Sequence, residues 1–382
     1  MSRSRELLRT LVGFDTTSRE SNLQLIEFVR DYLAGFGVAS ELIYNAARSK
    51  ANLFASIGPV ALPGIVLSGH TDVVPVDGQA WSVPPFELTE RDGKLFGRGT
   101  ADMKGYIACV LALVPELVKA TLRQPVHIAL SYDEEVGCLG VRSLLKVLEQ
   151  RPVKPMLCII GEPTELKPVL GHKGKLAMRC DVHGEACHSA YAPYGVNAIE
   201  HAAELIGELG RIGQRLRATR DARFDPPFST VQTGVMSGGK ALNIVPADCR
   251  FDFEIRALPS QDPGEVADEL KAYAEQQVLP RMQAVSAQSA IRFIELSAYP
   301  GLATDAHSQA AELIAAFSGS RAFGTVAFGT EGGLFDAVGI PTVVCGPGSM
   351  DQGHKPDEFV SVAQLNGCDE MLRRMYLSIT AL

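Results

Sequence analysis

The chain has 382 residues, 46% of them hydrophobic, and so exceeds the size at which one hydrophobic core usually stops growing. Its net charge of -8 comes from acidic and basic residues interleaved along the sequence, which argues against a nucleic-acid or anionic-membrane surface. We therefore expect two domains and partners that are neither nucleic acid nor membrane.

The N-terminal residues lack the apolar core and small-residue cleavage site of a signal peptide. The longest apolar stretch, 106–118, is too short to span a bilayer and contains Pro115 and Glu116. The eight cysteines are scattered without any Cys-x-x-Cys, which suits reduced core thiols better than a disulfide framework. These features predict a soluble, cytoplasmic protein.

The first part of the chain alternates between helical and extended patterns. Apolar residues at helical spacing predict helices, and continuous apolar runs predict strands covered on both sides. The expected helices are 5–13, 21–35, 106–117 and 141–148, and the expected strands are 52–57, 64–69, 126–132 and 156–160. A loop rich in Pro and Gly, 75–99, separates the second expected strand from the helix that follows it. This alternation predicts an α/β layer with a mainly parallel central sheet.

The pattern changes at about residue 175 and returns near residue 300. The intervening segment reads strand, helix, strand, strand, helix, strand, which is the plan of a ferredoxin-like module. Its elements are expected at 176–183, 196–216, 230–236, 248–257, 263–277 and 291–296. The α/β layer then resumes, with a strand at 341–345 and a closing helix at 362–377. We expect residues 1–174 and 300–382 to form one domain, interrupted by an inserted domain at 175–299.

Residues with metal-binding or acid–base chemistry follow the expected strands of the α/β layer. His70 and Asp72 end the second strand, Glu134 and Glu135 follow the third, and Glu162 follows the fourth. Ligands of such sheets bind outside the carboxyl ends of the strands. A histidine and an aspartate two residues apart suit a metal ligand and the carboxylate that orients it, although the same pair also caps ordinary turns.

A set of two imidazoles and several carboxylates is suited to zinc, with cobalt and manganese as tolerable substitutes. The set is completed by Asp102, in a Gly-rich loop before a helix, and by His354, in the loop after the last strand. Two ions in such a site require one bridging carboxylate, for which Asp102 is the natural candidate. Glu134 and Glu135 would point to opposite sides of an extended chain, so one would ligate while the other acts on water, unless both are simply solvated loop acids.

Five segments together resemble the signature motifs of the M20 family of dinuclear zinc peptidases and amidohydrolases. They are residues 68–75, 97–105, 133–137, 161–164 and 348–359, in the family's order and spread over nearly the whole chain. The wording of the last segment, of Gly-His-Lys-Gly-Lys at 171–175 and of the region around His188 is most similar to the acetylornithine deacetylase branch. The resemblance implies a zinc-peptidase-like catalytic domain and an inserted lid and dimerisation domain.

The resemblance also assigns roles to the strand-end residues. It implies that His70, Asp102 and Glu162 bind one Zn²⁺, that Asp102, Glu135 and His354 bind a second, that Glu134 is the general base, and that Asp72 is the partner of His70. The peptide bond after the bridging aspartate is cis in the family, so the Asp102–Met103 bond is expected to be cis.

Residues of the inserted domain complete the implied site. His188 is expected to stabilise the oxyanion from the second subunit of a homodimer; a zinc-binding Cys–His fragment is the alternative, but no second pair at useful spacing completes it. Asn243 and Arg256 are expected near the substrate carboxylate, although Arg256 could equally pair with Glu254 or face solvent.

The expected activity is metal-dependent hydrolysis of an N-acyl amino acid, N-acetyl-L-ornithine to L-ornithine and acetate in arginine biosynthesis. The rivals within the same metal chemistry are succinyl-diaminopimelate, N-acetylcitrulline, other acyl amino acids and dipeptides. A relative that has lost its metal and serves as a binding module is the rival outside enzymology, and it is disfavoured because every expected ligand and the base are present.

Overall fold

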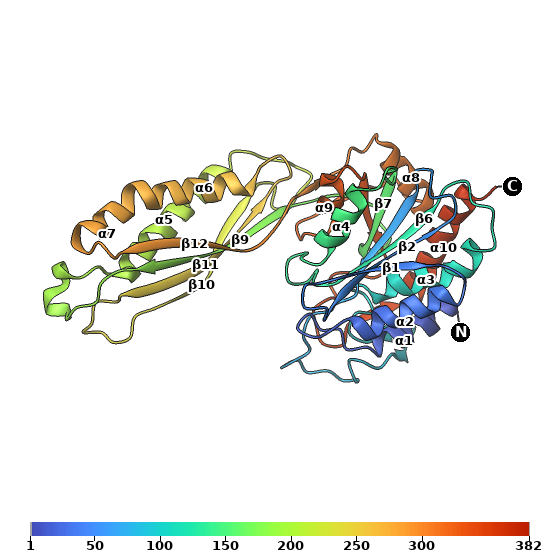
Figure 1. The fold of residues 1–382 in the computed structure, drawn as a ribbon, viewed down its shortest axis with the longest axis horizontal. Coiled ribbons are helices and arrows are strands. Elements are labelled where there is room, and N and C mark those ends of the chain that lie inside the picture. Colours follow the sequence, from blue (N-terminus) through green and yellow to red (C-terminus); the bar gives the residue numbers. More distant parts are fainter. Residues whose placement is uncertain (1, 382) are drawn as a thin grey trace. The chain divides into compact units, whose positions relative to one another are not determined.

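The computed structural model describes residues 2–381 (Figure 1). The described chain divides into two compact units. The first unit comprises the chain as far as Gly171, Leu302–Thr325, and the chain from Thr330 onward. The second unit comprises His172–Gly301 and Val326–Gly329. Each unit has its own cluster of buried apolar side chains, so each is described separately.

A nine-stranded sheet forms the centre of the first unit, in the order β1-β2-β6-β3-β7-β15-β8-β13 with β14 paired to β8. Strand β3 lies between β6 and β7 and runs parallel to both, and β15 runs parallel to β7. The strands are β1 (Ser40–Tyr44), β2 (Ala51–Ile57), β3 (Ile65–His70), β6 (Val126–Ser131), β7 (Leu157–Pro163), β8 (Val169–His172), β13 (Leu302–Ala303), β14 (Gly324–Val326) and β15 (Thr342–Gly346). The predicted α/β class with a parallel-containing central sheet is confirmed.

Helices cover this sheet because their apolar residues recur at helical spacing. Helix α4 (Val141–Glu149), for example, buries Val141, Leu144, Leu145 and Leu148 and packs with α9 (Gly332–Ala337). The other helices contribute to one continuous core on the sheet. They are α1 (Arg3–Val12), α2 (Leu23–Ala34), α3 (Lys104–Leu117), α8 (Gln309–Ser318) and α10 (Val362–Ile379). Helix α3 is buried on nearly all sides and begins two residues after Asp102.

A small three-stranded sheet lies where the sequence predicts only a loop. Its strands are β4 (Thr89–Arg91), β5 (Lys94–Phe96) and β16 (Phe359–Ser361), in the order β16-β5-β4. Three-residue strands are too short to show an alternating pattern, and Phe96 pairs with Phe359, which is distant in sequence. This pairing attaches the segment that follows His354 to the loop that precedes Asp102.

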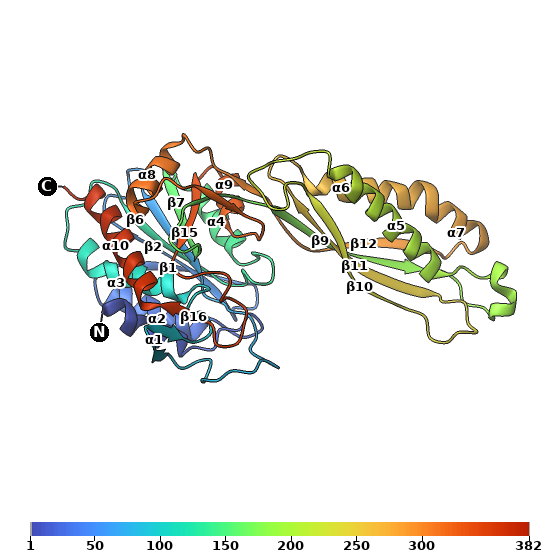
Figure 2. The same cartoon turned by 180° about the vertical axis from the view of Figure 1, so that it is seen from behind.

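The second unit contains a separate four-stranded antiparallel sheet in the order β10-β11-β9-β12. Its strands are β9 (Gly174–His183), β10 (Thr230–Gly238), β11 (Asp248–Ala257) and β12 (Ala290–Tyr299). Buried and less buried residues alternate along β9, and the helices lie over one face of the sheet (Figure 2). The helical segments are a 3-10 turn (Ser189–Tyr194), α5 (Ala198–Leu216), α6 (Pro263–Tyr273), a π turn (Ala274–Val278) and α7 (Leu279–Val285).

Two further expectations concern membranes and thiols. Among residues 2–381, no helix has the length and apolar character needed to span a bilayer. All eight cysteines are free thiols, and all but Cys187 are buried, as expected for core residues.

Candidate metal centre

The candidate centre lies at the carboxyl ends of the three parallel strands β6, β3 and β7. His70 is the last residue of β3, Glu162 lies near the end of β7, and Glu134 and Glu135 follow β6. Asp102 stands just before α3, and His354 lies in the loop between β15 and β16. Parallel strands end at the same edge of a sheet, so this topology brings the residues together.

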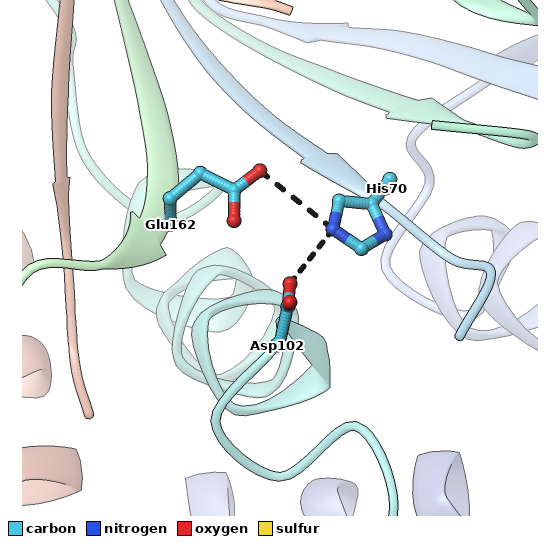
Figure 3. Close-up of side chains that lie close together, drawn as sticks. All are labelled: His70, Asp102 and Glu162. Carbon is cyan, nitrogen blue, oxygen red and sulfur yellow. Dashed lines mark hydrogen bonds and ion pairs between the residues drawn. The ribbon is translucent and has the colours of Figure 1, made fainter. Parts of the chain in front are cut away.

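Two groups of three side chains are formed, and they share Asp102. In the first, Nε2 of His70 lies 2.9 Å from Oδ1 of Asp102 and 3.6 Å from Oε1 of Glu162 (Figure 3). In the second, Nε2 of His354 lies 3.1 Å from Oδ2 of Asp102 and 3.1 Å from Oε2 of Glu135. Each oxygen of Asp102 therefore faces a different imidazole, which is the arrangement required of a bridging ligand.

The electrostatics of these groups favour an added cation. Burial, followed by repulsion from Asp102, raises the pKa of Glu135 to about 7 and that of Glu162 well above its ordinary value. Hydrogen bonds with Asp102 and Glu135 raise the pKa of His354 to about 10. Burial opposes ionisation of Asp102, but its hydrogen bonds with His354 and His70 hold its pKa below the ordinary value. The two groups together contain three carboxylates and only two imidazoles, so the negative charge exceeds what the imidazoles can balance.

The donor atoms fit a divalent cation of the zinc type. Nδ1 of His70 donates to the backbone carbonyl of Asp72 at 2.9 Å, so the Nε2 lone pair of a neutral ring points toward Asp102 and Glu162. Oε1 of Glu135 is buried without a hydrogen-bond partner among residues 2–381. Imidazole nitrogen combined with carboxylate oxygen suits zinc, cobalt or manganese.

The carboxylate of Asp72, the predicted partner of His70, lies beside the imidazole and also contacts the turn after β6. Its Oδ1 lies 3.6 Å from Nδ1 of His70, which is longer than a hydrogen bond. The carboxylate instead accepts the backbone N–H groups of Glu134 at 3.1 Å and Glu135 at 3.2 Å. The backbone carbonyl of Asp72 orients the imidazole, while its side chain holds the turn that carries Glu134 and Glu135.

Glu134 stands beside both groups without belonging to either. Its Oε1 accepts a hydrogen bond from the thiol of Cys138 at 3.4 Å. Burial raises its pKa well above the ordinary value, while the charge of His70 opposes that shift. Because Glu135 contacts His354 and Glu134 does not, the geometry separates the two neighbours that spacing alone left equivalent.

The three remaining predicted site residues lie in the second unit. His188 and Asn243 come together there: a bridge joins His188 to Ile244, and the backbone carbonyl of Asn243 accepts the N–H of Ser189. Both residues are exposed. Arg256 donates to Glu254 at 3.2 and 3.3 Å, the pairing that the sequence left open. It also donates to the hydroxyl of Tyr299 at 2.9 Å.

Sequence reasoning missed two buried acids close to the centre. Glu358 accepts the backbone N–H groups of Ala101 at 2.9 Å and Asp102 at 3.1 Å and pairs with Arg98 at 2.6 Å. Glu331 is buried, and desolvation raises its pKa to about 7. Neither has a partner nearby in sequence, so no local spacing indicates a role.

The Asp102–Met103 peptide bond is cis, as expected.

Comparison with known proteins matches residues 66–378 to the model of peptidase family M20/M25/M40. This chain belongs to that family. It is 37% identical to an acetylornithine deacetylase of Myxococcus xanthus over 97% of this chain and 96% of that protein. It is 34% identical to an acetylornithine deacetylase of Pasteurella multocida over 96% and 94% of the two chains.

Solved structures of M20 proteins share the fold. An M20 metallo-carboxypeptidase of Sulfolobus solfataricus superimposes with a TM-score of 0.77 at 20% identity, covering 99% of both chains. A dinuclear metal-binding peptidase of the M20 family from Bacillus subtilis gives a TM-score of 0.64 at 14% identity, covering 99% of this chain and 98% of that one. The protein is thus an M20 hydrolase, with His70, Asp102 and Glu162 as a buried candidate group of metal ligands.

The shared position of Asp102 makes a prediction that does not depend on activity. Adding Zn²⁺ or Co²⁺ to chelator-treated protein should raise the unfolding temperature. At a free metal concentration 100-fold above Kd, the free energy of unfolding should rise by about 2.7 kcal/mol. Asp102→Asn keeps the size of the side chain but removes its charge, and it should abolish most of this gain. Calorimetry and metal analysis measure both effects.

Asp351→Asn is the matched control, because Asp351 is exposed in the loop that carries His354. It should retain the metal content and thermal shift of the parent protein. Unchanged metal content in Asp102→Asn would show that Asp102 is not shared between two ions.

Proposed function

We propose that this M20 protein hydrolyses the amide bond of an N-acyl amino acid, with N-acetyl-L-ornithine as the substrate and arginine biosynthesis as its setting. The observation that carries the reaction class is the pair of ligand groups sharing Asp102 beside the separate carboxylate of Glu134. The substrate rests on the relatives that are 34% and 37% identical over nearly the whole chain.

In this proposal the two groups hold two Zn²⁺ ions, with Co²⁺ or Mn²⁺ as substitutes. His70, Asp102 and Glu162 hold one, and Asp102, Glu135 and His354 hold the other. Such ions polarise an amide carbonyl and lower the pKa of water toward neutrality. Glu134, which is next to the ligands without being one of them, takes the proton of the attacking water and returns it to the nitrogen of the leaving amine.

The role of Glu134 is tested by Glu134→Gln, which keeps the shape of the side chain but cannot accept the proton. We expect kcat to fall by about 10²- to 10⁴-fold while the metal content per subunit stays at the parental value. Glu149→Gln, at an exposed position that ends α4, is the control and should match the parent protein. Retention of kcat in Glu134→Gln would remove Glu134 as the base.

We also propose that residues 175–299 form a lid and dimerisation domain and that His188 stabilises the oxyanion across a homodimer. Nδ1 of His188 accepts the N–H of Ala190 at 3.1 Å, so in the neutral ring Nε2 carries the proton and can donate to an oxyanion. Strand β10 is an edge strand with exposed Val235 and Met236, a surface suited to pairing with a second copy.

Mixed dimers test this assignment. His188→Ala and Glu134→Gln homodimers should each be nearly inactive. If His188 acts across the dimer, re-annealed mixtures should recover about a quarter of parental activity, because half of the dimers then contain one intact site of two. A mixture no more active than its parents would mean that His188 acts within its own subunit or plays no part.

Substrate identity is the finer part of the proposal. Arg256 and Asn243 are proposed to bind the substrate carboxylate, for which a guanidinium is well suited. We expect kcat/KM to be highest for N-acetylornithine in a panel that also contains N-acetylcitrulline, N-acetylmethionine, succinyl-diaminopimelate and simple dipeptides. A higher value for any other member would reassign the substrate while leaving the metal chemistry in place. Loss of all hydrolysis and of metal binding would favour a binding module instead.

A further inference from the structure

The turn that carries Glu134 and Glu135 is held by residues that lie far from it in sequence. The carboxylate of Asp72 accepts both backbone N–H groups of this turn, and it also accepts the hydroxyl of Ser18, whose Oγ lies 2.7 Å from Oδ2. An aspartate carboxylate rotates over a broad range about its last torsion angle. A third hydrogen bond, from Ser18, restricts that rotation.

Backbone hydrogen bonds hold Ser18 beside the residues that follow strand β3. Its backbone N–H donates to the carbonyl of Val73, and the N–H of Val73 donates to the carbonyl of Thr16, each at 3.1 Å. The hydroxyl of Thr16 donates to the carbonyl of Thr71 at 2.6 Å. Residues 16–18 therefore run beside residues 71–73 as a short buttress, and the Ser18 hydroxyl points from it to Asp72.

Lys50 joins the same buttress to the other side of the turn. Its Nζ donates to the backbone carbonyl of Ser18 and to Oδ1 of Asp133, the latter at 2.5 Å. The side chains of Lys50 and Asp133 are only 13% and 17% exposed, so this ion pair is partly shielded from water. Asp133 has a φ of 56°, a left-handed conformation that aspartate adopts more readily than most residues other than glycine. The ion pair thus holds the left-handed residue that directly precedes Glu134.

We propose that Ser18 and Lys50 are positioning residues, which fix the turn after β6 so that Glu134 is aimed at its proton while Glu135 faces His354. Ser18 acts through Asp72, and Lys50 acts through Asp133 and through the carbonyl of Ser18. The inference rests on the proposed role of Glu134. It adds that the geometry of this base depends on two residues outside the ligand set and outside the turn.

The test compares Ser18→Ala and Ser18→Thr, with kcat and KM measured for the best substrate of the panel and normalised to bound metal. Ser18→Ala should lower kcat about tenfold with KM within about twofold, because small misplacements of a catalytic group reduce turnover more than binding. Ser18→Thr keeps the hydroxyl and should restore kcat to within about twofold. Ser21→Ala, whose hydroxyl binds the carbonyl of Ser49 instead, is the matched control.

Lys50 provides a second pair of variants if Ser18→Ala does not fold. Lys50→Gln should lower kcat about tenfold and Lys50→Arg should recover it, while Lys146→Gln, at an exposed position on α4, should have no effect. Because both residues act on one turn, the double variant Ser18→Ala/Lys50→Gln should lose less than the product of the single losses.

The outcomes separate this inference from the proposed function. Activity in Glu134→Gln would overturn the proposed base. An inactive Glu134→Gln together with full kcat in Ser18→Ala and Lys50→Gln would overturn the positioning role alone. A rise in KM without loss of kcat, failure of the conservative variants to restore kcat, or a multiplicative double variant would each also overturn that role.

Discussion

The first unit is built around a carboxylate that two imidazoles share. Asp102 faces His70 with one oxygen and His354 with the other, and Glu134, Glu135 and Glu162 lie close by. Gathering this much negative charge in a buried place is unfavourable, and the raised pKa values of the three glutamates express that cost. Bound divalent cations would reverse the balance, since they would be the largest charges in the site.

Holding Asp102 in this position requires support from distant parts of the chain. Glu358 accepts the N–H groups of Ala101 and Asp102, and Arg98 pairs with its second oxygen. Nζ of Lys104, which is fully buried, donates to the carbonyl of Phe14 at 2.8 Å. Burial lowers the pKa of Lys104 to about 7. The loop before α3 is therefore fixed from both sides, by the C-terminal segment through Glu358 and by the N-terminal segment through Lys104.

The sequence predicts a strand together with a candidate ligand where an apolar run ends at a residue that can bind a metal. Continuous apolar runs located β3, β6 and β7, and His70 and Glu162 follow from the ends of β3 and β7. It was uninformative where a contact joins remote segments. Glu358 and its partner Ala101 are 257 residues apart in sequence. Ser18 and its partner Asp72 are 54 residues apart. For Asp72, spacing gives the side of the strand end on which the carboxylate lies but not the further donors that it meets, which are the N–H groups of Glu134 and Glu135.

The two units contain different candidate site residues. The first unit contains both candidate ligand groups and Glu134, and solved structures of an aminopeptidase and of a metallo-carboxypeptidase share the fold of this chain. In the proposed function, discrimination among substrates falls to residues such as Arg256, which belongs to the second unit. Glu254 and Tyr299 use three of its five N–H groups, so within the described chain two remain for a substrate carboxylate. A guanidinium held in place by Glu254 and Tyr299 loses little conformational freedom on binding, which makes it suited to recognising a fixed carboxylate.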